Sequence, residues 1–258
     1  MISLKNPEQI RKMREAGAIL YEVLQELRGQ IKPGVTTAAL DVFAEQLIRK
    51  HHAIPSFLHY QGYPATICAS VDDAVVHGIP SHKQVLQEGQ IISIDCGVQL
   101  DGWQADSAFT MGVGEISPEA AKLIEVTEQC FFDGVKQAVA GNRLGDIGHA
   151  VQQVAESHGY GVIRDLTGHG IGRNLHEDPA VFNFGEPGHG MRLRKGMTIA
   201  VEPMIAAGTW RVTQDKDGWC FRTADHSLCA HYEHTIAINE DGLPELLTYP
   251  GFTWKEDA

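Results

Sequence analysis

Apolar residues recur at helical spacing in four segments of the chain. The first follows Asn6-Pro7, which supplies an N-cap and a proline at the first helical position. The others begin at Thr36 or Thr37, at Ser117 and near residue 144. Strand-like runs cover residues 65–76, 89–111, 160–166, 196–202 and 228–238. The sequence therefore predicts an α+β fold in which helices cover a mostly antiparallel sheet.

Landmarks of the first half recur in the second half at a constant offset of 107 residues. Gly34 corresponds to Gly141, Gly89 to Gly196, and Asp95 to Glu202. We therefore expect a single domain over residues 1–258, built from two αα-β-hairpin halves of about 6–112 and 117–240. A pseudo-twofold axis between the halves would bring Asp95 near Glu202, and a cleft between related halves is a common place for a site.

Asp101-Gly102 separates two strand-like runs, which is a strong signal for a two-residue hairpin turn. With these residues in the turn, Asp106 lies opposite Gly97, and Asp95 lies opposite Ala108. The two carboxylates then share one face as diagonal neighbours, roughly 7–8 Å apart at the backbone. Like charges so close favour one or two divalent cations between them. A three-residue loop or a bulge would instead put them on opposite faces, with one in solvent or capping the turn.

The composition narrows the compartment and the partners. The chain has 258 residues and a net charge of −12, so no overall basic field recruits nucleic acid or anionic lipid. We expect the basic cluster of Arg192, Arg194 and Lys195 to be solvated surface. Five cysteines without a Cys-x-x-Cys motif indicate free thiols in a reducing cytosol. There is no signal-peptide pattern and no apolar run of roughly 20 residues, so we expect a cytoplasmic protein that does not span a membrane.

Four carboxylates and one histidine are expected to converge. Glu233 lies in the last long strand-like run and is the counterpart of Asp106 by the internal symmetry, which adds it to Asp95, Asp106 and Glu202. His169 is flanked by glycines that let the backbone approach closely and present the ring. This oxygen-rich set matches two divalent cations, as in two-metal hydrolases including aminopeptidases, and not a structural zinc site. A satisfied core or surface role is the alternative for His169.

The motifs that carry this set resemble those of the type I methionine aminopeptidases, over about residues 3–248. They are Val75-Val76-His77-Gly78-Ile79-Pro80, Ile94-Asp95, Asp106-Ser107, Gly168-His169-Gly170-Ile171-Gly172, Leu175-His176-Glu177-Asp178-Pro179, Val201-Glu202-Pro203-Met204 and Tyr232-Glu233-His234-Thr235. The resemblance implies the pita-bread fold in its short bacterial form. It also implies removal of the initiator methionine from nascent proteins whose second residue is small.

The resemblance implies a role for each matched residue. The metal ligands would be Asp95, Asp106, His169, Glu202 and Glu233, around two divalent ions that could be Co, Mn, Fe or Zn. Water or hydroxide bridging the ions would be the nucleophile, with Glu202 as general base. His77 would contact the scissile amide, and His176 a substrate carbonyl and the developing oxyanion, although both could be turn histidines before proline. The methionine side chain would bind among Tyr60, Tyr63, Cys68, Leu175 and Trp219, any of which could be plain core.

The chain departs from the family pattern at several positions. Leu175 stands where phenylalanine is usual, and His231 where glutamine is common. Asp72 replaces an asparagine and is expected to add negative charge near the mouth of the cleft. Gln61 and Gln104-Ala105 also differ from the frequent residues. None of these changes removes a ligand, so they bear on substrate range and metal affinity.

The resemblance also implies the partners. We expect the substrates to be nascent polypeptide N-termini at the ribosome, and the protein to be a cytoplasmic monomer that reads no nucleic acid. A proline-directed peptidase of the same fold, a prolidase or aminopeptidase P, is one alternative. Those enzymes carry a large N-terminal domain, whereas the first helix here begins at Asn6. The other alternative is a non-catalytic pita-bread module that binds histone or RNA partners.

Overall fold

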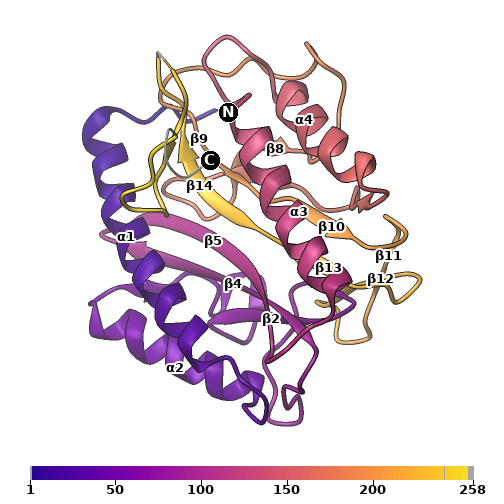
Figure 1. Ribbon diagram of the computed structural model, residues 1–258. Helices are drawn as coiled ribbons and strands as arrows, with labels where there is room; N and C mark the ends of the chain where they lie inside the picture. The colour runs from indigo at the N-terminus through magenta and orange to yellow at the C-terminus, as the bar shows by residue number, and fades with distance from the viewer. Residues whose placement is uncertain (1, 241, 255–258) are drawn as a thin grey trace.

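The computed structural model describes residues 2–240 and 242–254 (Figure 1). The helices are α1 (Pro7–Gln30), α2 (Thr37–Lys50), α3 (Pro118–Val135) and α4 (Leu144–Ser157), with a short 3-10 helix η1 (Tyr60–Gly62). All four helical segments predicted from the apolar spacing are therefore present. Asn6 caps α1 and exchanges two hydrogen bonds of 2.9 Å with Gln9, while Thr36 and Ser117 cap α2 and α3.

The strands form one large sheet and two small ones. They are β1 (Ile54–Pro55), β2 (Ile67–Val71), β3 (Ala74–Val76), β4 (Ile91–Leu100), β5 (Trp103–Gly112), β6 (Gly161–Val162), β7 (Gly168–Gly170), β8 (Glu177–Val181), β9 (Thr198–Val201), β10 (Met204–Ala206), β11 (Val212–Gln214), β12 (Phe221–Thr223), β13 (Cys229–His231), β14 (Glu233–Ala237) and β15 (Glu245–Leu246). The large sheet has the order β1-β4-β5-β14-β9-β7-β8, with β2 on β4 and β15 on β14. The small sheets are β13-β10-β6 and β11-β12-β3. Every ladder between these strands is antiparallel, which confirms the predicted α+β class.

Two apolar clusters hold the helices on the sheet. In the first, Leu20 of α1 is buried with Ile94 of β4 and Phe109 of β5. In the second, Phe131 of α3 is buried with Ile236 of β14. Each such side chain contributes roughly 1.5–3 kcal/mol when it is fully buried. Figure 1 shows the resulting arrangement, with α1 and α2 beside β4 and β5, and α3 and α4 beside the later strands.

Positions 107 residues apart adopt the same unusual backbone conformation. Gly34 and Gly141 have φ of 88° and 102°, and Gly89 and Gly196 have φ of 87° and 82°. The element order α1-α2-β4-β5 is followed by α3-α4-β9-β14. The segment between β9 and β14 contains an additional arm, β11 and β12, whose second strand pairs with β3 of the first half. The repeat boundaries of 6–112 and 117–240 stay a prediction.

The structure also bears on the features predicted from composition. All five cysteines are buried and free, as expected for a reducing compartment. Arg192, Arg194 and Lys195 are exposed. Within the described residues, no helix combines the length and the apolar character that crossing a membrane requires.

Candidate active site

The β4–β5 hairpin places two aspartates side by side. Asp101 and Gly102 both have left-handed backbone angles, with φ of 49° and 75°, which is the two-residue turn that Asp-Gly favours. The register pairs Gly97 with Asp106 and Asp95 with Ala108, so the predicted alignment is confirmed and the bulged alternative is wrong. Asp95 and Asp106 therefore lie on the same face of the hairpin as diagonal neighbours.

Strand β14 brings a third carboxylate against the hairpin. Glu233 pairs with Ala108 across the β5–β14 ladder. Asp106 N donates to Thr235 Oγ1 at 3.0 Å, and Thr235 Oγ1 donates back to the Asp106 carbonyl at 2.8 Å. Ser107 Oγ donates to the Glu233 carbonyl at 2.6 Å. These bonds fix Asp106 and Glu233 relative to each other across a large separation in sequence.

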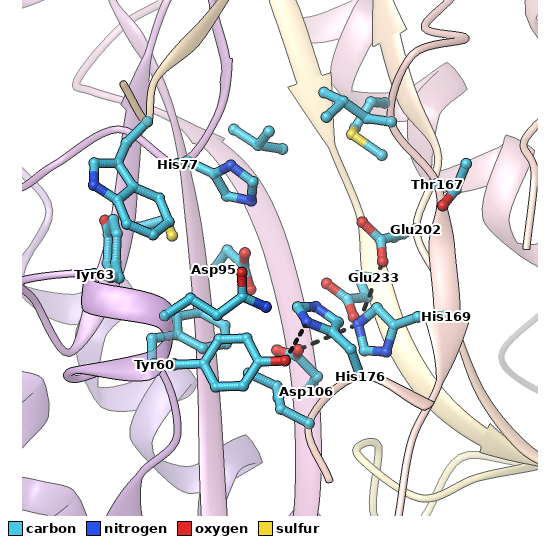
Figure 2. A pocket seen from close by; sticks show the side chains of 18 residues that line it. Tyr60, Tyr63, His77, Asp95, Asp106, Thr167, His169, His176, Glu202 and Glu233 are labelled. Carbon is cyan, nitrogen blue, oxygen red and sulfur yellow. Dashed lines mark hydrogen bonds and ion pairs between the residues drawn. The ribbon is translucent and has the colours of Figure 1, made fainter. Parts of the chain in front are cut away.

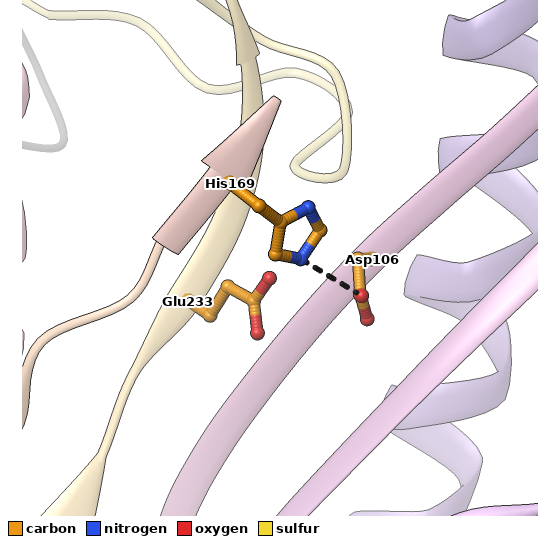
Figure 3. Close-up of side chains that lie close together, drawn as sticks. All are labelled: Asp106, His169 and Glu233. Atoms are coloured by element: carbon orange, nitrogen blue, oxygen red, sulfur yellow. Dashed lines mark ion pairs between the residues drawn. The ribbon is translucent and has the colours of Figure 1, made fainter. Parts of the chain in front are cut away.

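Glu202 and His169 approach the same point from the next strands of the sheet. Glu202 follows β9, and its backbone carbonyl accepts from Asn183 Nδ2 at 2.9 Å. His169 lies in the middle of β7, where its Nε2 is 3.7 Å from Asp106 Oδ2 and 3.7 Å from Glu202 Oε1 (Figures 2 and 3). The glycines beside His169 are required because a Cβ at Gly168 or Gly170 would overlap backbone carbonyls of the neighbouring strands.

Burial sets the protonation of this cluster. Desolvation raises the pKa of Asp106 to about 7 and raises the pKa of Asp95, Glu202 and Glu233 above the ordinary carboxyl range; their mutual repulsion adds to the shift of these last three. Desolvation also lowers the pKa of His169 to about 4, so its ring is neutral at neutral pH. His169 Nδ1 lies 2.9 Å from the Gly170 carbonyl and can donate to it, which leaves the Nε2 lone pair directed at the carboxylates.

The donor set fits divalent cations. Asp95 Oδ1, Asp106 Oδ1 and Glu233 Oε1 are buried and have no hydrogen-bond partner among the described residues. Ligand atoms of Asp106, His169 and Glu233 lie within 4.8 Å of one another, as one ion would require (Figure 3). Buried oxygen atoms without partners are costly, and positive ions are what would satisfy them.

Two more histidines border the cluster. His176 Nδ1 lies 2.9 Å from Tyr60 Oη, and its ring packs edge-on against His169 with centroids 4.1 Å apart. His77 follows β3 and has a φ of 59°, a strained conformation for a residue other than glycine. Desolvation lowers the pKa of both rings, that of His176 to about 4, so each can donate one hydrogen bond while neutral.

An apolar cavity opens beside the carboxylates. It measures about 220 Å³. Every residue assigned to the site from the sequence lines it: Tyr60, Tyr63, Cys68, His77, Asp95, Asp106, His169, Leu175, His176, Glu202, Trp219 and Glu233 (Figure 2). Tyr63 packs edge-on against Trp219 with centroids 5.1 Å apart, and its hydroxyl donates to the Ile67 carbonyl at 3.0 Å. The polar and apolar parts of the predicted site are thus brought together.

Several lining residues were not predicted. They are Phe57, Val76, Leu166, Thr167 and Met204, together with Gln61, which the sequence analysis noted only as a departure. His231 is a further addition, because its Nε2 lies near Glu202 and Glu233. The sequence predicted one strand-like run over residues 228–238, in which residues two apart would face the same way. The structure divides this run into β13 and β14, so the position of His231 also depends on how these strands are placed.

Asp72 does not behave as expected. Its carboxylate accepts from Ile91 N at 3.0 Å and from Gln90 Nε2 at 2.7 Å, and it does not line the cavity. Its φ of 55° places it in a tight turn between β2 and β3. The prediction that Asp72 adds charge at the mouth of the cleft is therefore wrong, because a turn holds the carboxylate against the start of β4.

Comparisons with known proteins agree with this geometry. Residues 11–240 match the profile of metallopeptidase family M24. Curated methionine aminopeptidases of Clostridium acetobutylicum and Bacillus subtilis are 55% and 47% identical to the chain, each over 96% of it and 99% of the relative. The crystal structure of a Thermotoga maritima methionine aminopeptidase has a TM-score of 0.94 at 44% identity and covers 96% of this chain and 99% of that one.

More distant neighbours share the fold alone. An Xaa-Pro dipeptidase from Bacillus anthracis has a TM-score of 0.77 at 22% identity, and the match covers 97% of this chain but 63% of that one. Both groups of neighbours confirm the expected pita-bread fold.

Proposed function

This chain belongs to metallopeptidase family M24, and we propose how its residues remove an N-terminal methionine. Curated methionine aminopeptidases are 42–55% identical to it over nearly its whole length. The protein is accordingly a metal-dependent aminopeptidase, and its cofactors are divalent metal ions. The observation that best supports the assignment of residues is the convergence of four buried carboxylates and His169 beside an apolar cavity.

The proposed ligands are the residues whose donor atoms converge. They are Asp95, Asp106, His169, Glu202 and Glu233, which would hold two ions. When bound, such ions act as Lewis acids and lower the pKa of water toward neutrality. Among Co, Mn, Fe and Zn, the carboxylates of this set favour Mn, while its imidazole suits the others.

The remaining polar groups would act on the peptide bond. Glu202, which lies beside His169 and the other carboxylates, would accept and return a proton as general base. His77 would contact the scissile amide and assist the leaving amine. His176, oriented by Tyr60, would donate a hydrogen bond to a substrate carbonyl and to the charge that develops on it.

The apolar cavity would bind the methionine side chain. Tyr63, Cys68 and Trp219 supply aromatic and sulfur surfaces against which a thioether packs favourably. Leu175 is 3% exposed and contributes to the same cluster, where phenylalanine is usual in the family. We propose that the substrates are nascent chains with a small second residue, which the protein binds at the ribosome. We further propose that it is a cytoplasmic monomer and that its 258 residues form one catalytic domain.

The proline-directed alternative is less well supported. The solved structures of an Xaa-Pro dipeptidase and of two prolidases match at 20–22% identity, and the matched part covers about two thirds of those chains. The non-catalytic module is disfavoured because the curated relatives are enzymes and all five proposed ligands are retained.

Peptide hydrolysis after metal removal tests the assignment. We would strip the protein with a chelator, add back each divalent ion, and compare a Met-Ala-Ser peptide with an Ala-Pro dipeptide. The expected result is metal-dependent release of methionine and no cleavage of Ala-Pro. Asp106→Asn should fail with every ion, because it removes a carboxylate from the cluster. Full activity of the stripped protein, or preferential cleavage of Ala-Pro, would refute the proposal.

A further inference from the structure

His231 is held in a fixed position next to the proposed metal ligands. It ends β13, where its backbone N donates to Thr110 Oγ1 at 2.8 Å and its carbonyl accepts from the same hydroxyl at 2.8 Å. On its other side it pairs with Met204 of β10. The residue is 1% exposed, so its ring is surrounded by protein atoms and is almost out of contact with solvent.

The His231 ring faces two carboxylates without bonding to either. Its Nε2 is 3.6 Å from Glu233 Oε2 and 3.9 Å from Glu202 Oε2. Hydrogen bonds of this type are 2.7–3.2 Å long, so these are not hydrogen bonds. Nε2 is buried and has no partner among the described residues. A buried imidazole nitrogen without a partner is costly, and its direction toward two carboxylates indicates what would satisfy it.

The position of His231 mirrors that of His169. His169 Nε2 lies 3.7 Å from Glu202 Oε1, and His231 Nε2 lies 3.9 Å from the other oxygen, Oε2. The Glu202 carboxylate is therefore flanked by one imidazole on each side. Ligand atoms of Glu202, His231 and Glu233 lie within 4.8 Å of one another, as do those of Asp106, His169 and Glu233.

These separations suit a shared ion. Two atoms that each lie about 2.0–2.2 Å from one ion are at most roughly 4.4 Å apart. The distances from His231 to both carboxylates fall within this limit. The same reasoning supports His169, which the family resemblance had already assigned.

We propose that His231 is a sixth ligand, whose Nε2 binds the ion shared by Glu202 and Glu233. The inference rests on the proposed metal centre and adds a second imidazole to it. Nitrogen donors suit Fe, Co and Zn, whereas carboxylate-rich sites suit Mn. His231 therefore shifts the preference of this centre from Mn toward the nitrogen-preferring metals.

Metal binding by variants tests the proposal apart from turnover. Metal-free protein would be titrated with CoCl₂ and with MnCl₂ by calorimetry. Loss of a residue that only supports the ligands typically weakens metal binding by roughly tenfold or more. For His231→Gln we therefore expect Co²⁺ binding to weaken by at least about tenfold, and Mn²⁺ binding to weaken less. His77→Gln is the matched control, because it makes the same substitution at another histidine of the cavity. Among the residues that the structure describes, no carboxylate forms an ion pair with the His77 ring. An equal loss in both variants would overturn the proposal.

A spectroscopic measurement needs no variant and therefore does not depend on folding of a mutant. Pulsed electron paramagnetic resonance of the Mn²⁺-loaded protein, labelled with ¹⁵N-histidine, counts the imidazole nitrogens bound to the ions. Two coupled nitrogens are expected, and a single one would refute the role of His231.

His169→Gln distinguishes failure of this inference from failure of the proposed metal centre. If this variant leaves both metal binding and the nitrogen signal unchanged, the proposed centre itself is wrong.

Discussion

The backbone contacts of Gly78 fix the position of the neighbouring His77. The Gly78 carbonyl accepts from Ala69 N at 2.8 Å and from Tyr63 Oη at 3.1 Å, and the Gly78 N–H donates to Ser70 Oγ at 3.2 Å. A Cβ at this position would overlap the Ala69 carbonyl oxygen and come within 2.9 Å of its carbon. Gly78→Ala is therefore expected to push the His77 segment away from β2.

The size of the effect follows from these contacts. Ordinary carbon separations are 3.5–4.0 Å, so the segment must move by about 1 Å. Each hydrogen bond that is stretched or lost costs about 1 kcal/mol, so Gly78→Ala should destabilise the fold by about 1–3 kcal/mol. A displacement of this size at a catalytic group lowers kcat by on the order of a hundredfold.

Steady-state kinetics on a Met-Ala-Ser peptide and thermal unfolding of the same preparations measure both effects. Gly29→Ala is the matched control, because Gly29 lies in α1 and a Cβ there meets nothing within 4 Å. That control should keep wild-type kcat and gain up to about 1 kcal/mol from helix propensity. Wild-type kcat and stability in Gly78→Ala would show that the segment is not fixed by these contacts and would refute the reasoning.

Three other perturbations follow from the site. Glu202→Gln keeps the shape of the side chain but removes the proposed base, so kcat should fall by roughly 10²–10⁴-fold while the circular dichroism spectrum stays unchanged. Near-normal turnover would show that Glu202 is not the general base. Tyr60→Phe deletes the 2.9 Å contact to His176 Nδ1 and should lower kcat/KM by about five- to tenfold, and equal kinetics in both proteins would show that the hydroxyl does not orient the ring. In metal-free protein, burial raises the pKa of Asp106 to about 7 from 3.8, so the folded state holds a proton that the unfolded chain has released between these values. Relative to Asp106→Asn, which lacks this titration, the metal-free wild-type protein should therefore lose stability as pH rises from about 4 to 7. Urea unfolding of both proteins at each pH measures the difference, and parallel stability profiles would be the contrary result.

The sequence predicts best what is local. The turn at Asp101-Gly102 needs left-handed angles at both residues, and this requirement alone fixes the register that aligns Asp95 and Asp106. The caps of α1, α2 and α3 were readable for the same reason, since a cap involves residues three positions apart. The repeat then allowed Glu202 and Glu233 to be assigned by symmetry, without any knowledge of the sheet order.

The rest depends on contacts between distant segments. Phe57, Leu166 and Met204 line the cavity, but an apolar residue in a cavity wall has the same pattern as one in the core. The pairing of β12 with β3 joins residues about 150 positions apart, and no periodicity reports it. His231 was noted as a departure but not as a neighbour of Glu202, because its placement depends on how β13 meets β10.

The pairing of β5 with β14 has a consequence for synthesis. Asp106 and Thr235 exchange two hydrogen bonds although 129 positions separate them, so one half of the site has left the translation machinery long before the other half exists. Domains form as units during translation, and contacts between distant segments are slow to close. Throughout that interval the hairpin that carries Asp95 and Asp106 lacks β14, and a chain that ends before Glu233 is expected to lack the proposed metal centre. The nascent chain is therefore expected to be inactive until β14 has been synthesised and has paired with β5.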